Sequence, residues 1–347
     1  MHLILMSLII LGLTACTQAQ SSLNKGERQL SLEITNASND DYGYAFNLAK
    51  STGMQLTTLA LMWDELELSP GNFSPETNWL KIANDFFPEQ NLSITLVINP
   101  IDTNRLRLPK DLENKAFEDP IVIARYKTLI DYVFTQIPDL TLSSFSVGNE
   151  IDDYLGTNKE RWAQYSRFFE EVSAYIRTKR EGLVVGSKLG FGGLTDSAYK
   201  LSQGIIQASD AVMLTYYPLK EDFTVKNPDV VHGDFAKLVE LFPNKPIYVL
   251  ESGYPSSELL GSSESKQAAF VDEIFSAWDE QAAHIKVLDF LWLHDLPPVV
   301  VDDLSGYYGL NNDKFKAFLG TLGLRTFEGQ DKKAFQTLVR ETKVRGW

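Results

Sequence analysis

Short segments rich in β-branched residues alternate with longer amphipathic segments along most of this 347-residue chain. Segments of helical period include residues 41–50, 79–87, 121–136, 161–178, 235–242 and 264–282. Alternation of this kind predicts a parallel sheet with crossover helices, and eight repeats close a barrel. We therefore predict an α/β fold, a single (β/α)₈ TIM barrel, with its eight strands at residues 31–35, 56–61, 93–98, 142–147, 183–188, 211–215, 247–250 and 287–291.

A doubly wound open sheet is the structural alternative. No Gly-rich phosphate-binding turn follows any early strand segment, which disfavours that arrangement. The first strand could also be replaced by the segment around Tyr44. The chain has no Gly/Ser linker, low-complexity tract or internal repeat in its middle, so residues 28–347 are expected to form one catalytic domain.

The N-terminus has the pattern of an export signal. Residues 1–13 are apolar and end in Leu13-Thr14-Ala15-Cys16, but the run is shorter than the roughly 20 residues that span a bilayer. It resembles a bacterial lipobox, although the usual Lys or Arg is missing. This resemblance implies a signal peptide at 1–16, lipid attachment at Cys16, a polar tether at 17–27, and a protein anchored in the bacterial cell envelope at the outer membrane or cell surface. The alternative is a free cysteine buried in an N-terminal helix.

The charge of the chain restricts its partners. With 46 acidic against 32 basic residues the formal net charge is −14, which disfavours nucleic acid and anionic membrane surfaces and favours a neutral substrate. The single cysteine and the histidines show no metal-ligand spacing, so no metal is expected. We expect a monomer that needs no cofactor and meets the membrane only through its lipid anchor.

Two carboxylates stand at the ends of predicted strands. Glu150 closes the fourth in Val-Gly-Asn-Glu, and Glu251 closes the seventh in Val-Leu-Glu-Ser. In a (β/α)₈ barrel both would emerge at the C-terminal rim, where such barrels carry their active sites. Two facing carboxylates suit the cleavage of a glycosidic bond, since one protonates the leaving oxygen and the other attacks or stabilises the sugar carbon. The alternative is that Glu150 caps the next helix and Glu251 pairs with a surface lysine.

Other polar and aromatic residues follow the predicted strands. We expect substrate contacts from a set of amides, phenols and indoles at the rim: Asn149, Tyr216, Tyr217, Trp292, Trp63 and Asn99. Lys188 ends the fifth strand, and we interpret it as a solvated or ion-paired rim residue rather than a catalytic amine.

These motifs resemble glycoside hydrolase clan A, the retaining enzymes built on a (β/α)₈ barrel. The segments around Asn149-Glu150, Tyr216-Tyr217 and Glu251 are most similar to family 53, the endo-β-1,4-galactanases. The resemblance implies that Glu150 is the acid/base, that Glu251 is the nucleophile, and that Tyr216 or Tyr217 supports it. The basic residue common in the clan near the second strand has no counterpart in residues 59–64, and residues 63–73 resemble other clan A families such as xylanases and β-galactosidases.

The expected function is a lipid-anchored retaining β-glycosidase. Its substrate would be a plant or algal polysaccharide or oligosaccharide, possibly a β-galactan, cleaved by double displacement. The alternative is a catalytically silent, glycan-binding surface lipoprotein that keeps the same barrel.

Overall fold

The computed structural model describes residues 23–196 and 198–347. The predicted lipid-attachment residue Cys16 and the signal peptide therefore lie outside the described residues. Of the predicted tether, residues 23–27 are described, and the Lys25 backbone N–H donates to the Arg345 carbonyl near the end of the chain. No helix of the described part is long and apolar enough to cross a membrane.

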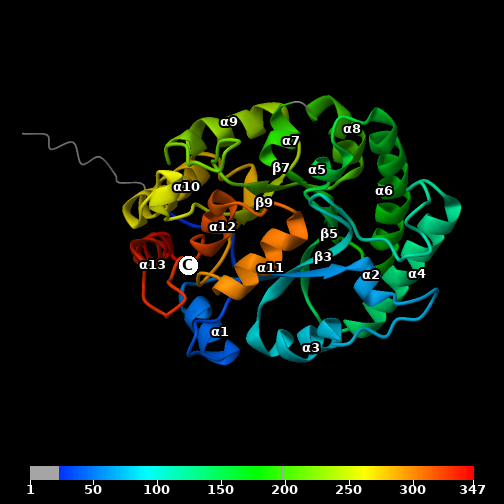
Figure 1. The fold of residues 1–347 in the computed structure, drawn as a ribbon, viewed down its shortest axis with the longest axis horizontal. Helices are drawn as coiled ribbons and strands as arrows, with labels where there is room; N and C mark the ends of the chain where they lie inside the picture. Colours follow the sequence, from blue (N-terminus) through cyan, green and yellow to red (C-terminus); the bar gives the residue numbers. More distant parts are fainter. Residues whose placement is uncertain (1–22, 197) are drawn as a thin grey trace, which may run out of the picture.

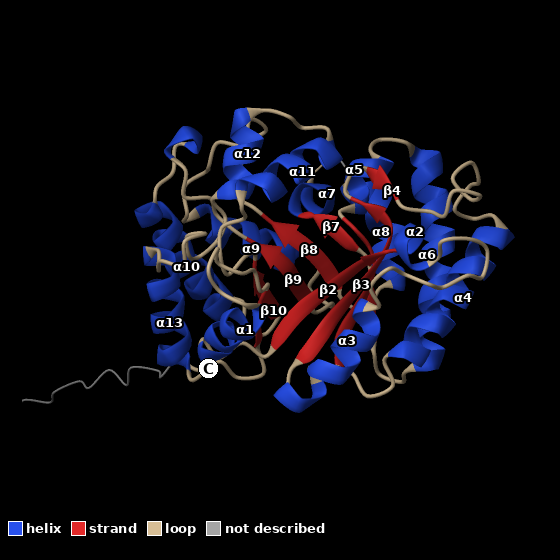
Figure 2. Ribbon diagram, turned by 60° about the horizontal axis from the view of Figure 1, so that its bottom comes forward, coloured by secondary structure: helices blue, strands red, loops and turns tan. Residues whose placement is uncertain are grey.

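Parallel strands form a closed barrel, as Figures 1 and 2 show. The last strand, β10, pairs with β1 in parallel register. The fifth strand position is divided into β6 and β7, of which β6 pairs with β5 and β7 with β8, so the chain itself closes the barrel there. This confirms the predicted (β/α)₈ fold. The parallel strands are β1 (Gln29–Leu32), β2 (Leu56–Met62), β3 (Ser93–Asp102), β5 (Leu142–Asn149), β6 (Val184–Gly186), β7 (Lys188–Gly190), β8 (Val212–Tyr216), β9 (Ile247–Ser252) and β10 (Ile285–Phe290).

Helices surround the barrel in the order that the sequence pattern predicts (Figure 1). The six predicted helices correspond to α1 (Tyr42–Ser51), α3 (Trp79–Phe86), α4 (Pro120–Gln136), α6 (Lys159–Lys179), α9 (Val230–Leu241) and α10 (Glu264–Glu280). Further helices were not predicted: α2 (Trp63–Leu66), α5 (Ile151–Leu155), α7 (Phe191–Thr195), α8 (Tyr199–Ala208), α11 (Pro298–Tyr308), α12 (Asp313–Gly320) and α13 (Lys333–Arg345).

Two apolar clusters stabilise the barrel. The larger one packs the outer faces of the strands against the helix layer. The smaller one joins Leu56, Met213, Leu250 and Val287, which come from four different strands. Because β2 and β8 are not neighbours in the sheet, these side chains meet across the interior of the barrel. The interior is therefore filled by side chains at this level.

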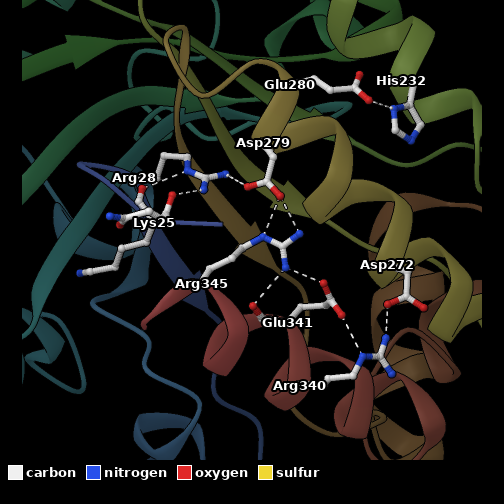
Figure 3. A network of polar contacts seen from close by, with 10 residues as sticks. Lys25, Arg28, His232, Asp272, Asp279, Glu280, Arg340, Glu341 and Arg345 are labelled. Atoms are coloured by element: carbon white, nitrogen blue, oxygen red, sulfur yellow. Dashed lines mark hydrogen bonds and ion pairs between the residues drawn. The ribbon is translucent and has the colours of Figure 1, made fainter. Parts of the chain in front are cut away.

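A polar network joins the beginning and the end of the described chain (Figure 3). Asp279 on α10 forms an ion pair with Arg28 at 2.7 Å and accepts two hydrogen bonds from Arg345 on α13 at 2.9 and 2.6 Å. The two arginine side chains are each 3% exposed. Arg345 also forms an ion pair with Glu341, so Asp279 is the carboxylate that both buried arginines share.

Replacing Asp279 with Ala is expected to destabilise the fold by about 3–5 kcal/mol, because the buried Arg28 loses its carboxylate partner and Arg345 keeps only Glu341. Urea unfolding followed by circular dichroism measures this. Asp272→Ala is the matched control: Asp272 pairs with the half-exposed Arg340 on the same helix surface, and its loss should cost no more than about 1 kcal/mol. Equal losses in the two variants would contradict a structural role for the buried network.

Candidate active site

A cavity of about 580 Å³ opens among the C-terminal ends of the strands. Glu150, which follows β5, and Glu251, on β9, both line it. The barrel therefore brings together two carboxylates that are about a hundred residues apart in the sequence. Asn149, Tyr217, Trp292 and Asn99 line the same cavity, as do residues that the sequence did not single out.

The backbone before Glu150 is shaped to aim its side chain. Gly148 has a φ of +82°, and a Cβ there would lie 2.6 Å from the Ile151 side chain and 2.8 Å from the Tyr165 hydroxyl. Only glycine fits this turn without displacing its neighbours. Glu150 itself has a left-handed φ of 43°, and its side chain makes no capping hydrogen bond to α5. The interpretation of Glu150 as a helix cap is therefore wrong for this structure.

Both carboxylate oxygens of Glu150 accept hydrogen bonds from threonines, one directly after β3 and one on β8. Thr103 Oγ1 donates to one oxygen at 2.9 Å, and Thr215 Oγ1 donates to the other at 2.7 Å. Burial, and then the nearby charge of Glu251, raise the pKa of Glu150 to about 8, although Thr215 opposes the shift. At neutral pH this carboxyl group holds a proton, which is the state a general acid requires.

Glu251 has the opposite environment. One of its oxygens forms an ion pair with Lys188 on β7, and the other accepts a hydrogen bond from the Tyr217 hydroxyl at 2.9 Å. The Lys188 side chain is only 1% exposed. Burial works against its charge, but Glu251 and the neighbouring carboxyl groups outweigh burial and raise the pKa of Lys188. A lysine and a phenol thus contact the two oxygens of Glu251, an arrangement that suits a carboxylate nucleophile. Lys188 is therefore ion-paired, and its partner is Glu251.

Lys188→Met is expected to lower kcat/KM on an aryl glycoside by about 10²–10³-fold, because Glu251 loses its counter-cation in a buried site. Initial rates of aryl glycoside hydrolysis measure this loss.

Lys332→Met is the matched control for that substitution. Lys332 is also buried, pairs with Asp295 at 2.7 Å, and does not line the cavity. Its loss should lower stability but leave kcat/KM of the folded enzyme near the wild-type value. An unchanged kcat/KM in Lys188→Met would contradict the assigned role of Lys188.

A third carboxyl group, Glu33, enters the cavity directly after β1. Burial, and then the charges of Asp289 and Glu251, raise the pKa of Glu33 well above its usual range. Asp289 lies below it on β10 and accepts hydrogen bonds from Ser31 at 2.6 Å and Thr58 at 3.0 Å. Sequence reasoning missed Glu33 because the predicted first strand, residues 31–35, begins two residues later than β1 and contains it.

Two amides in the cavity present unpaired oxygens. Asn149 Nδ2 donates to Asp102 Oδ1 at 2.9 Å, while Asn149 Oδ1 and Asn99 Oδ1 are buried and have no partner among the described residues. Buried amide oxygens without partners call for an explanation, because leaving one unpaired costs about 1–3 kcal/mol. A ligand rich in hydroxyl donors, such as a sugar, would pair them.

Two of the predicted substrate-binding residues do not reach the cavity. Tyr216 is buried between the barrel and the helix layer, and its hydroxyl donates a hydrogen bond to Asp234 on α9 at 2.8 Å. Successive residues on a strand point to opposite faces, so only Tyr217 of the pair faces Glu251. Trp63 is fully buried and donates its indole N–H to Glu67 at 2.8 Å. Their assignment as substrate contacts is corrected to structural packing.

The segment after β10 covers the open end of the barrel. Figure 2 shows α11 and α12 at the end toward which the barrel strands run. Tyr307 and Tyr308 of α11, and Phe315 and Phe318 of α12, line the cavity. These helices were not predicted, because their residues follow the last strand and the pattern of eight strand–helix repeats ends there.

Comparison with known proteins identifies the fold. No known family model matches the chain, and no curated protein matches its sequence. Among solved structures, the exo-beta-1,4-mannosidase Op5Man5 from Opitutaceae bacterium strain TAV5 shares 16% identity at a TM-score of 0.69, covering 92% of this chain and 59% of that one. The chain thus spans less than two thirds of that protein.

Two further structures are similar. A GH5_18 protein from Bifidobacterium longum subsp. longum ATCC 55813, in complex with Manβ1-4GlcNAc, has 12% identity, a TM-score of 0.71, and coverage of 91% and 78%. A family 39 glycoside hydrolase from Bacteroides cellulosilyticus WH2 has 14% identity, a TM-score of 0.63, and coverage of 91% and 64%. At these identities the likeness establishes the (β/α)₈ barrel fold.

The described residues contain no group of three or more His, Cys, Asp or Glu side chains placed to hold an ion.

Proposed function

We propose that this protein is a retaining β-glycosidase in which Glu251 is the nucleophile and Glu150 the acid/base. The observation that carries the proposal is the contrast between two carboxyl groups in one cavity. Glu251 is paired with Lys188 and Tyr217, whereas burial keeps Glu150 protonated at neutral pH. A carboxyl group with a raised pKa suits a general acid, and a carboxyl group paired with a cation suits a nucleophile.

The reaction follows double displacement. Glu251 attacks the anomeric carbon while Glu150 donates its proton to the departing oxygen, and a covalent glycosyl-enzyme and a free alcohol result. Glu150, now ionised, removes a proton from water, which attacks the same carbon and releases Glu251. Asn149 and Asn99 have free amide oxygens that would accept hydrogen bonds from sugar hydroxyls, and Trp292 supplies an indole face in the cavity.

The stereochemistry of the first product tests the mechanism. Proton NMR during hydrolysis of an aryl β-glycoside should show the β-anomer forming first, followed by slow mutarotation. An activated 2-fluoroglycoside, which slows release of the intermediate, should add one sugar mass to the peptide that contains Glu251. First formation of the α-anomer would mean inversion, and a label on another residue would reject Glu251 as the nucleophile.

The proposed sugar source is a plant or algal polysaccharide or its oligosaccharides. The motif similarity to endo-β-1,4-galactanases supports β-galactan as the first candidate substrate. The mannosidase and the Manβ1-4GlcNAc complex among the similar structures support β-mannosides as the second. A panel of 4-nitrophenyl β-glycosides of galactose, mannose, glucose and xylose identifies the sugar, and chromatography of the products from galactan, xylan, mannan and β-glucan identifies the linkage.

We further propose that the protein is anchored to the bacterial cell envelope through Cys16, on the basis of the lipobox at Leu13 to Cys16. Cys16→Ser is expected to move the protein from the detergent phase to the aqueous phase, or to leave its signal peptide uncleaved, because acyl chains supply the membrane affinity. Detergent-phase partitioning with immunoblotting measures this. Equal partitioning of the mutant and the native protein would reject Cys16 as the anchor.

A further inference from the structure

The cavity has two chemically different sides. Polar groups, including Glu33, Asn99 and Asn149, lie beside the catalytic pair at the ends of the strands. The other side is formed by α12, α11 and the loop after β8, and it presents mostly leucine and phenylalanine side chains. We call this side the apolar roof and define it as Leu219, Phe223, Leu304, Phe315 and Phe318.

The apolar roof is continuous with the partners of both catalytic residues. The ring of Tyr217, which donates to Glu251, lies 5.4 Å from that of Phe318, measured between centroids. Phe318 and Phe315 each pack against Phe223, at 5.8 and 5.1 Å. Phe315 in turn contacts Tyr308 at 6.1 Å, and Tyr308 lies beside Thr103, the threonine that donates to Glu150.

Hydrogen bonds hold the roof in place at the α11 end. The Tyr307 hydroxyl donates to Asp102 at the end of β3 at 2.9 Å and accepts from Arg107 at 2.9 Å. Asn104 Nδ2 donates to the Tyr308 carbonyl, also at 2.9 Å. Figure 1 shows α11 lying across the barrel toward β3 and α2. The roof is thus tied to the opposite side of the barrel mouth.

The α12 part of the roof is joined to the part that follows β8. Lys314 forms an ion pair with Asp222, in the loop after β8, at 2.7 Å. The apolar side chains of both parts line the cavity.

The two sides of the cavity suit two different parts of a substrate, the attacked sugar and the departing alcohol. The attacked sugar needs partners for its hydroxyl groups, and the polar side supplies Glu33 and the two unpaired amides. The departing alcohol then lies toward the apolar roof. A second sugar there would bury hydroxyl groups against leucine and phenylalanine and leave them without hydrogen-bond partners, which is unfavourable. A hydrocarbon group would instead gain by the removal of its apolar surface from water.

We propose that the preferred leaving group is an apolar alcohol, so that the substrate class is a β-glycoside whose single sugar carries a hydrocarbon aglycone. This inference rests on the proposed glycosidase activity. It keeps the attacked β-linked sugar of the proposed function, but it replaces the polysaccharide or oligosaccharide on the leaving side with an apolar group.

Two glycosides of one sugar test the proposal. Methyl and octyl β-glycosides have leaving groups of similar acidity, so a difference between them reports contact with the alkyl chain. The sugar is the one whose 4-nitrophenyl β-glycoside is hydrolysed fastest, and its β-linked disaccharide is measured alongside. The octyl glycoside should have a kcat/KM about 10²-fold above the methyl glycoside, the effect of burying about three methylene groups, and should also exceed the disaccharide.

Two variants on α11 locate the effect. Leu304→Asn should lower the octyl-to-methyl ratio at least tenfold, because it places an amide in the apolar roof. Val299→Asn is the matched control: Val299 is 64% exposed on the same helix, and the ratio should stay at its wild-type value. If the Leu304 variant fails to fold, the octyl-to-methyl ratio of kcat/KM in the wild type still tests the proposal.

The outcomes separate this inference from the proposed function. Equal rates on methyl and octyl glycosides, or a faster disaccharide, would overturn the apolar aglycone while the glycosidase assignment stands. Failure to hydrolyse any of the glycosides, including the activated aryl ones, would overturn both.

Discussion

Glu251→Ala is expected to reduce kcat on every glycoside by on the order of 10⁵-fold, as removal of a nucleophile does in enzymes that use a covalent intermediate. No glycosyl-enzyme can form without this carboxylate. The apolar methyl group also leaves Lys188 buried without its strongest counter-charge, which adds a stability loss that thermal unfolding would detect.

Azide distinguishes a lost nucleophile from a lost fold. In Glu251→Ala, azide can occupy the space of the missing carboxylate and attack the sugar from that face. An activated aryl β-glycoside should then give the α-glycosyl azide, identified by NMR. Formation of the β-azide would reverse the assignment of the two glutamates, and wild-type turnover would reject the site.

Glu150→Ala is expected to lower kcat/KM by about 10²–10⁴-fold on glycosides whose leaving group needs a proton. A 2,4-dinitrophenyl glycoside needs none, so the first step should be nearly unaffected and the intermediate should accumulate as a burst. Azide then attacks that intermediate from the side that water would use, and the product should be the β-glycosyl azide. The basic limb near pH 8, which comes from the proton on Glu150, should disappear from the first step.

Equal losses on activated and unactivated glycosides would contradict an acid role for Glu150. Asp153→Ala is the matched control, since Asp153 lines the same cavity but accepts no hydrogen bond from Thr103 or Thr215. It should keep the dependence on the leaving group that the wild type shows.

The alternation of apolar and amphipathic segments predicted the barrel, because a strand buried in a parallel sheet is a short, mostly apolar segment of the sequence. The ends of those runs placed Glu150 and Glu251 at the same rim, since parallel strands all end on one side. The same reasoning could not choose between Tyr216 and Tyr217, because the face that a side chain takes depends on the exact register of β8.

What only the tertiary structure decided is which groups meet. The sequence by itself determined the strand ends, and with them Lys188, Glu150 and Glu251 as rim residues. Folding brought Lys188 on β7 to Glu251 on β9. It also brought Thr103, which follows β3, and Thr215 on β8 to Glu150. It also laid α11 and α12 over the cavity. Protonation states and substrate shape depend on burial and on contacts between distant segments, and neither is encoded in any single stretch of the chain.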